Sequence, residues 1–292
     1  MKLIGLMPVR NEEWCLGLTL RAALMWLDEI VVGLHHIEDN SAVIAGEVGR
    51  EYPGRIQYVA FGDPQWSEMA HRQALLETAR RRGATHVAMV DADEVLTGNL
   101  LQQVRPAILA LKPGFTLQLP WLALPRSVNY YITEGTWGAG QQVSMAFKDE
   151  SAAHWATRNG YDFHHRNPMG LPAGRFTQPL TAADGGIMHL QFLSERRLRA
   201  KQALYQATEV LRWPGRKKPE ELAAMYGRAV YESSPKVAAA AVPASWWAPY
   251  SEWMKYLDLS EDAAPWQETT LRNLVTTYGR KHFDGLDFFG IV

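Results

Sequence analysis

Three carboxylates within four positions, Asp91, Asp93 and Glu94, directly follow an apolar run of the chain. That run, residues 87–90, has the composition of a strand buried on both faces. Carboxylates at the end of such a strand are costly to bury unless they are paired or bind a cation. Two hard oxygen ligands one residue apart suit a divalent metal and, through it, a diphosphate. The spacing therefore predicts a metal site that holds a phosphorylated ligand.

Strand and helix patterns alternate four times in the 95 residues that contain these carboxylates. The expected strands are 3–7, 29–34, 55–61 and 87–90, and the helices begin near residues 12, 41 and 66. Pro8 is expected to end the first strand, and Asn11 is expected to cap the first helix. This alternation predicts a parallel, doubly wound α/β sheet whose strand ends share one ligand-binding edge.

Polar clusters follow three of the expected strands, at 8–13, 35–41 and 91–94, and should converge at that edge. Further strands are expected at 115–119, 143–147 and 186–190, and further helices at 100–111, 194–213, 220–231 and 269–278. Residues 149–184 are rich in Gly, Pro, His and Asn, which predicts loops over the active edge. We therefore expect an α/β fold with a Rossmann-like, mixed, mostly parallel sheet flanked by helices and with a C-terminal helical extension.

Composition narrows the classes of partner. The 292-residue chain has a formal net charge of −1, so no global field attracts nucleic acid or an anionic membrane. A single cysteine, Cys15, excludes an internal disulfide framework and fits a reducing compartment. The N-terminus lacks the pattern of a signal peptide, and no apolar run is long enough for a membrane span. We expect a cytoplasmic protein with no membrane span.

The assembled pattern resembles the family 2 glycosyltransferases of the GT-A fold, over roughly the first 100 residues. The matching segments are Pro8-Val9-Arg10-Asn11-Glu12-Glu13, Glu38-Asp39-Asn40-Ser41, His71-Arg72-Gln73 and Asp91-Ala92-Asp93. The last of these looks like the Asp-X-Asp (DXD) motif of the family. Met188-His189-Leu190, followed by Ser194, Glu195 and Lys201, is similar to a late segment of some members.

The resemblance implies a role for each matching position. Asp93 would be the principal metal ligand, Asp91 would contact the ribose or the water shell of the metal, and His189 would be a third metal ligand. Mixed carboxylate and imidazole ligands with diphosphate oxygens suit Mn²⁺ or Mg²⁺. The residues that would hold the nucleotide are Pro8, Arg10, Glu12 and Asp39 at the base and ribose, and Arg72 and Lys201 at the diphosphate. Arg10 departs from the family, which usually has an aromatic or small residue there.

A catalytic base has no distinguishing spacing in this sequence. An inverting transferase needs a carboxylate that deprotonates the acceptor hydroxyl. Asp149, Glu150 and Asp162 follow the metal motif, and we expect the base among them, with Asp149 preferred. A retaining enzyme stays open if none of them faces the sugar.

The resemblance implies a hexosyltransferase that moves a sugar from a nucleoside-diphosphate donor, UDP-linked in our expectation, to a hydroxyl acceptor. We expect a saccharide or glycan precursor as acceptor, a catalytic domain over 1–213, and a mostly helical extension over 214–292 packed on it. A hydroxylated base in DNA is an alternative acceptor, because basic residues gather between positions 196 and 218. A non-catalytic module that binds sugar nucleotides or glycans is a further alternative. A nucleotidyltransferase fits less well, because the loop after the first strand is acidic rather than Gly-rich.

Overall fold

The computed structural model describes residues 1–292 except 139–140, 164–165, 172–174, 177–179, 235 and 261–263. Its described residues form two compact units. Unit 1 comprises Met1–Trp121, Gln142–His189 and Pro243–Asp258, and unit 2 comprises Leu122–Gln141, Leu190–Val242 and Leu259–Val292. The expected boundary between a catalytic domain and an extension at residues 213 and 214 stays a prediction.

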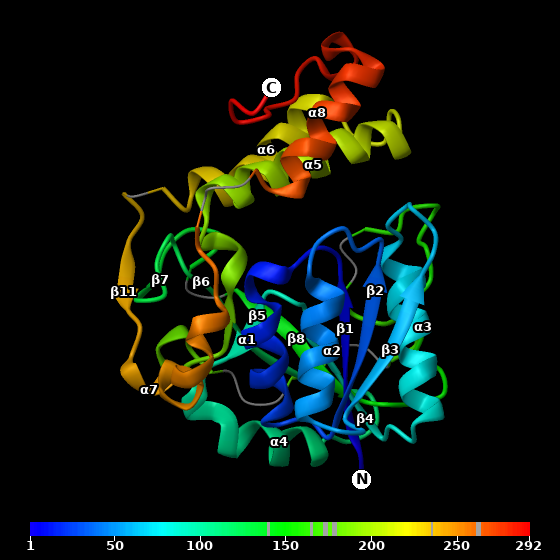
Figure 1. The fold of residues 1–292 in the computed structure, drawn as a ribbon, viewed down its shortest axis with the longest axis vertical. Coiled ribbons are helices and arrows are strands. Elements are labelled where there is room, and N and C mark those ends of the chain that lie inside the picture. Colours follow the sequence, from blue (N-terminus) through cyan, green and yellow to red (C-terminus); the bar gives the residue numbers. More distant parts are fainter. Residues whose placement is uncertain (139–140, 164–165, 172–174, 177–179, 235, 261–263) are drawn as a thin grey trace. The chain divides into compact units, whose positions relative to one another are not determined.

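Unit 1 is built on a mixed β-sheet, whose strands β1 to β4 are labelled in Figure 1. Its strand order is β3-β2-β1-β4-β8-β6-β10-β5, and β9 also pairs with β6. The strands are β1 Leu3–Val9, β2 Glu29–His35, β3 Ile56–Phe61, β4 His86–Met89, β5 Glu94–Leu96, β6 Phe115–Ala123, β8 Gln142–Lys148, β9 Arg175–Phe176 and β10 Ile187–His189. The first four strands pair in parallel, whereas β8 runs antiparallel to both β4 and β6. The predicted mixed α/β class is confirmed.

Helices α1 Glu13–Leu24, α2 Ser41–Glu51, α3 Glu68–Arg81 and α4 Leu101–Leu109 connect the first strands of the sheet. The apolar sides of the central strands pack into two clusters, one around Leu3, Met7 and Val32 and the other around Ile4, Leu6 and Val31. Alternate residues of β1 and β2 thus enter opposite cores, which requires a strand buried on both faces. A short helix α7 Ala244–Trp247 and the 3₁₀ helix η4 Ala248–Tyr256 return to this unit, where Tyr250 donates a hydrogen bond to the carbonyl of Leu96.

Unit 2 contains the helices α5 Glu195–Arg212, α6 Pro219–Tyr231 and α8 Trp266–Tyr278 and the two-stranded sheet of β7 Tyr130–Ile132 and β11 Ala239–Ala241. Ser194 caps α5 as predicted, because its hydroxyl accepts a hydrogen bond from the amide of Arg197. A cluster that includes Leu222, Leu271 and Phe288 joins the three helices to the C-terminal tail. The strands β7 and β11 were not expected from the sequence. No helix in the described ranges combines the length and apolar character that crossing a bilayer requires.

Candidate active site

The strand order changes direction next to β1, because β2 and β3 lie on one side of it and β4 on the other. The pairing of β1 with β4 ends at Leu6 and Met89, and the amide of Val90 donates to the carbonyl of Leu6. Two residues later, Pro8 still pairs with Gly33 of β2, so β1 extends through Val9 rather than ending at Pro8 as expected. Pro8 lacks an N–H on the side from which β4 has departed, where no ladder hydrogen bond is needed. Ligands of open α/β sheets bind at such a change of strand order.

The loops after β1 and β2 are joined by side-chain hydrogen bonds, as their predicted convergence requires. The two carboxylate oxygens of Asp39 accept the amides of Glu13 and Ser41, at 2.9 and 2.8 Å. Asn11 lies at φ 54° and accepts the amide of Glu38 at 2.8 Å. The expectation that Asn11 caps α1 is wrong, because Glu12 holds the N-cap position and Asn11 bridges the two loops instead.

Glu12 is also placed at this edge, where its carboxylate accepts the indole N–H of Trp14 at 2.7 Å and its amide donates to the Ser41 hydroxyl. Glu12 and Asp39 are thus joined through Ser41, and Pro8 lies near the end of β1, four residues before Glu12. Their contacts are with the protein itself in this structure, and their roles toward a nucleotide stay predictions.

Arg10 lies beside a pair of buried imidazoles at the ends of β2 and α3. The ring centroids of His35 and His71 are 4.7 Å apart, and Trp66 meets both edge-on. Burial lowers the pKa of His71 to about 4, and the positive charges of His35 and Arg10 act in the same direction. Burial also lowers the pKa of His35, partly opposed by its hydrogen bond to the Asp63 carbonyl. Both rings are therefore neutral near pH 7.

Two arginines hold the first carboxylate of the Asp-X-Asp segment. Asp91 Oδ1 accepts Arg72 Nη2 at 2.9 Å, and Asp91 Oδ2 accepts Arg166 Nη1 at 2.8 Å. Arg72 also donates to Glu68 at 3.0 Å. Burial alone would raise the pKa of Asp91, but the charges of Arg72 and Arg166 outweigh it and hold that pKa below its usual range. Because each Asp91 oxygen already binds a guanidinium, this arrangement does not favour Asp91 as a direct metal ligand.

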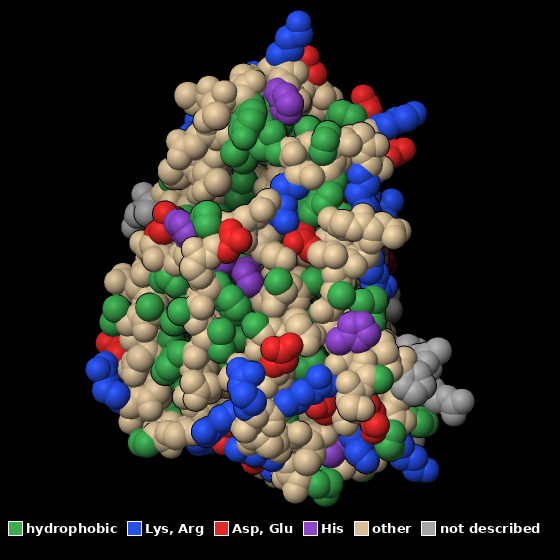
Figure 2. All heavy atoms as spheres, turned by 90° about the vertical axis from the view of Figure 1, so that its right-hand side faces the viewer, with side chains coloured by type: hydrophobic (Ala, Val, Ile, Leu, Met, Phe, Trp, Pro, Cys, Tyr) green, Lys and Arg blue, Asp and Glu red, His purple; other side chains and the backbone are tan. Residues whose placement is uncertain are grey.

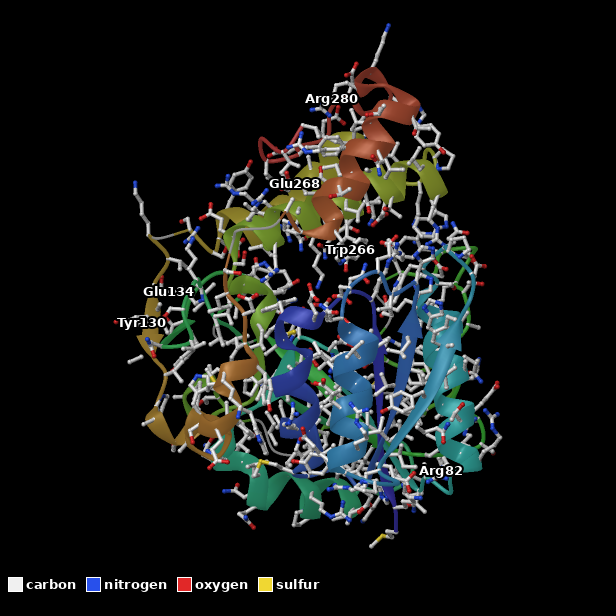
Figure 3. The ribbon with its side chains drawn as sticks, in the orientation of Figure 1. Arg82, Tyr130, Glu134, Trp266, Glu268 and Arg280 are labelled. Atoms are coloured by element: carbon white, nitrogen blue, oxygen red, sulfur yellow. The ribbon has the colours of Figure 1, made fainter. Side chains whose placement is uncertain are left out.

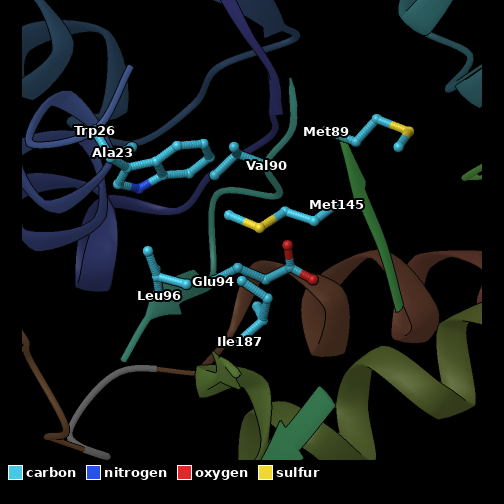
Figure 4. Close-up of a pocket in the computed structure, with 8 residues that line it drawn as sticks. All are labelled: Ala23, Trp26, Met89, Val90, Glu94, Leu96, Met145 and Ile187. Atoms are coloured by element: carbon cyan, nitrogen blue, oxygen red, sulfur yellow. The ribbon is translucent and has the colours of Figure 1, made fainter. Parts of the chain in front are cut away.

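Glu94 fixes the turn that carries Asp91 and Asp93. Its side chain accepts two N–H groups of Arg166, each at 2.8 Å, and the amide of Asp91 at 3.2 Å. The carboxylate lies among apolar side chains that line a small cavity (Figure 4), namely Ala23, Trp26, Met89, Val90, Leu96, Met145 and Ile187. A carboxylate in such surroundings requires the neighbouring guanidinium. Glu94 therefore supports the loop.

The pairing of β5 with β10 brings His189 next to Asp93, although the two residues are 96 positions apart. His189 Nε2 lies 3.4 Å from Asp93 Oδ2, and each residue is only 5% exposed. The indole of Trp121 stacks on the His189 ring, with centroids 4.4 Å apart and planes at 11°. This stacking fixes the plane of the imidazole and directs its ring nitrogen at the carboxylate.

Asp149, the preferred catalytic base, lies at the opposite end of β4. Its amide donates to the carbonyl of Thr85, just before β4, and its carboxylate binds Arg80 through two hydrogen bonds of 2.9 and 2.8 Å. The expected catalytic role of Asp149 does not agree with this position, because β8 runs antiparallel to β4 and carries the residue away from Asp93.

Asp162 and Lys201 are two further residues that the sequence predicted for the site. Asp162 is buried in the segment after β8, and its role as a base stays a prediction. Lys201 lies on α5 in unit 2, and its contact with a diphosphate also stays a prediction.

Arg166 and Trp121 are the members of this site that sequence reasoning did not assign to it. Arg166 stands 72 positions after Glu94 in an irregular segment, and no spacing rule links the two. Within the described residues, no group of three or more His, Cys, Asp or Glu side chains is arranged to hold a metal.

Comparison with known proteins gives matches among solved structures only. No protein-family model matches the sequence, and no curated protein matches it. TarS 1–349 of S. aureus in complex with UDP shares 14% identity over 97% of this chain and 90% of that chain, with a TM-score of 0.45. Against a longer TarS structure the chain spans 54% of that protein's length.

Two other solved structures are similar to the same degree or less. The mannosyltransferase PcManGT of Pyrobaculum calidifontis, in complex with GDP-Man and Mn²⁺, shares 17% identity over 94% of this chain and 74% of that chain, with a TM-score of 0.45. Glucosyl-3-phosphoglycerate synthase of Mycobacterium tuberculosis, in complex with Mn²⁺, UDP and phosphoglyceric acid, shares 14% identity over 44% of each chain, with a TM-score of 0.29. With identities below 20% and TM-scores below 0.5, these similarities do not establish the family.

Proposed function

We propose that the chain is a metal-dependent glycosyltransferase of the GT-A type, which moves a sugar from a nucleoside-diphosphate donor to a hydroxyl acceptor. The observation that carries the proposal is the pair of Asp93 and His189 at the change of strand order. Their facing atoms are 3.4 Å apart, longer than a typical hydrogen bond. Adjacent ligands of one octahedral cation stand about 3 Å apart, so the pair suits a shared Mn²⁺ or Mg²⁺.

The charges around this pair suit a diphosphate. Arg72 and Arg166 stand next to Asp91, and a side-chain nitrogen of Arg72, Nη1, is buried with no hydrogen-bond partner among the residues that the structure describes. A buried donor without a partner is costly, and an anionic oxygen would satisfy it. We therefore keep Arg72 as the residue that receives a donor phosphate.

The mechanism follows from the leaving group. A divalent cation supplies Lewis acidity that stabilises the charge growing on the departing diphosphate. Asp93 and His189 would hold that cation. Trp121 stacks on the His189 ring and fixes its orientation. Arg72 would add a charge-assisted hydrogen bond to the diphosphate. Asp162 stays the candidate base for the acceptor hydroxyl, and inversion or retention is open.

We expect the acceptor to be a saccharide or glycan precursor. The alternative of modified DNA depended on basic residues in unit 2, and several of these are paired with acids. Arg196 binds Glu268, which is labelled in Figure 3, while Arg199 binds Glu195 and Lys217 lies 3.6 Å from Glu209. On the face shown in Figure 2, Lys and Arg side chains also lie among Asp and Glu rather than in one large basic region. These acidic partners offset part of the positive charge that a DNA backbone would contact, so we prefer the saccharide.

The first test is donor binding. UDP-, GDP- and dTDP-sugars are screened with Mn²⁺ for a rise in Tm and for slow hydrolysis of the donor, with UDP-sugars expected to respond most. Asp93→Ala should abolish the ligand-dependent shift and lower hydrolysis by about a hundredfold or more. Asp149→Asn is the matched control, because it removes a carboxylate at the other end of β4 and should keep the shift.

Two results would contradict the proposal. One is a chain that no nucleotide sugar stabilises with Mn²⁺ present. The other is an Asp93→Ala variant that responds as the wild type does. Binding of nucleotide sugars without any metal-dependent hydrolysis would instead favour the non-catalytic binding module.

A further inference from the structure

Arg166 is saturated by contacts within the protein. Its Nε donates to the Ser144 carbonyl at 2.8 Å, and its Nη2 donates to the Met89 carbonyl at 2.6 Å and to Glu94 at 2.8 Å. Its Nη1 donates to both Asp91 and Glu94 at 2.8 Å. A guanidinium has five N–H donors, and these five contacts use them all. Arg166 therefore has no donor left for a substrate.

The Arg166 guanidinium occupies a position in which a metal ion could also bind. It lies between the carboxylates of Asp91 and Glu94 and contacts both, as a bridging divalent cation does. The Glu94 side chain is 2% exposed and the Arg166 side chain 14%. Without Arg166, the carboxylates of Asp91 and Glu94 would lose the guanidinium that joins them. Such a pair would attract a cation in its place.

We propose that Arg166 is a positioning residue that acts as a built-in cation, which keeps Asp91 and Glu94 from binding metal and leaves one divalent cation site at Asp93 and His189. This inference rests on the proposed function, whose metal site it makes more specific. It has a consequence for the order of binding. Among the described residues, a bare ion would meet Asp93 and His189 as ligands, with the positive charges of Arg166 and Arg72 nearby. The diphosphate of the donor supplies the missing oxygens and offsets those charges, so metal and donor bind together.

The test measures Mn²⁺ binding directly, by the electron paramagnetic resonance signal of free Mn²⁺, with and without UDP. The wild type is expected to bind one Mn²⁺ per chain, weakly alone and at least about tenfold more tightly with UDP. Arg166→Gln removes the positive charge and frees the Glu94 carboxylate and one oxygen of Asp91, so it should tighten the binding of bare Mn²⁺ on the order of tenfold. The same variant should weaken the coupling to UDP and reduce donor turnover.

Two variants control for charge and for attachment of the segment. Arg166→Lys keeps the charge and should bind bare Mn²⁺ within about threefold of the wild type. Arg80→Gln removes an arginine that also holds this segment, through Asp149 and the carbonyls of Glu150 and Ala153, but at the far end of β4. It should leave Mn²⁺ affinity unchanged. A role of Arg166 in folding alone would not predict a gain in metal affinity.

The outcomes separate this inference from the proposed function. A folded Arg166→Gln chain that binds bare Mn²⁺ no more tightly than the wild type, while the wild type shows coupling with UDP, overturns this inference alone. A wild-type chain that binds no Mn²⁺ with or without UDP overturns both. If Arg166→Gln does not fold, the wild-type stoichiometry decides, because two Mn²⁺ per chain would contradict a site restricted to one.

Discussion

The two ends of β4 carry arginine–carboxylate pairs of similar geometry in different surroundings. At the amino end, Arg80 binds Asp149 through two hydrogen bonds, and their side chains are 27% and 11% exposed. At the carboxyl end, Arg166 binds Glu94 through two hydrogen bonds and Asp91 through a third. Both arginines thus attach the segment that follows β8, one at its beginning and one further along.

The pKa of the arginine is raised at both ends of β4, but the physical causes differ. The hydrogen bond to Asp149 is the main cause that raises the pKa of Arg80. For Arg166, burial is the largest influence and would lower the pKa, but the charges of Glu94 and Asp91 raise it overall. The amino end is a partly solvated one-to-one pair that joins two segments. The carboxyl end is a buried network in which one guanidinium holds two carboxylates.

The largest expected effect is on stability. Arg166→Gln leaves Glu94 in apolar surroundings without its cation, so it should lower the free energy of unfolding by about 3–5 kcal/mol. Arg80→Gln acts on a pair nearer to solvent and should cost about 1–2 kcal/mol. Urea unfolding at pH 7 measures both. Equal losses for the two variants would contradict the difference in burial between the two ends.

The sequence alone predicted much of the first 94 residues. Local patterns predicted the alternation of strands and helices through β4, because an apolar run and the polar residues that end it are adjacent in the sequence. The convergence of the loops at Asn11 and Asp39 followed from the rule that parallel strands end at one edge.

Contacts between residues far apart in the chain could not be predicted from sequence patterns. His189 reaches Asp93 through β5, a strand of three residues that no periodicity could indicate. Asp149 was assigned to the wrong end because the direction of β8 decides its position, and a single strand's sequence does not encode its direction. Arg166 lies in an irregular segment, where residue type gives no guide to its partner. Contacts of this kind depend on tertiary packing rather than on spacing along the chain.

A smaller effect is expected on Mn²⁺ affinity when Trp121, near the carboxyl end of β4, is replaced. Trp121→Leu removes the ring that stacks on His189, and we expect Mn²⁺ affinity in the presence of UDP to fall about tenfold. Trp253→Leu is a matched control, because Trp253 is also half-buried in unit 1 but contacts Tyr250 instead. Titration with Mn²⁺ measures both. Should Trp121→Leu keep wild-type affinity, the stacking has no part in orienting the ligand.

The smallest expected effect is in acid, because buried imidazoles lie at both edges of the sheet. Burial lowers the pKa of His71 to about 4 at the carboxyl edge, and burial also lowers the pKa of His86 at the start of β4. An unfolded histidine has a pKa near 6.5, so between about pH 6.5 and 4 the unfolded chain binds more protons than the native one. Stability should therefore fall as the pH falls through that range.

Glutamine variants separate the contributions of the two edges. His71→Gln should lose less stability than the wild type between pH 7 and 4.5, because the group that resists protonation is absent. His86→Gln should follow the wild type more closely, because its pKa shift is smaller. Urea unfolding at pH 7, 5.5 and 4.5 measures the slopes. A His71→Gln slope that matches the wild type would mean that the imidazole pair at the carboxyl edge does not titrate with folding, and acid sensitivity would then belong to the carboxylates that Arg72 and Arg166 hold.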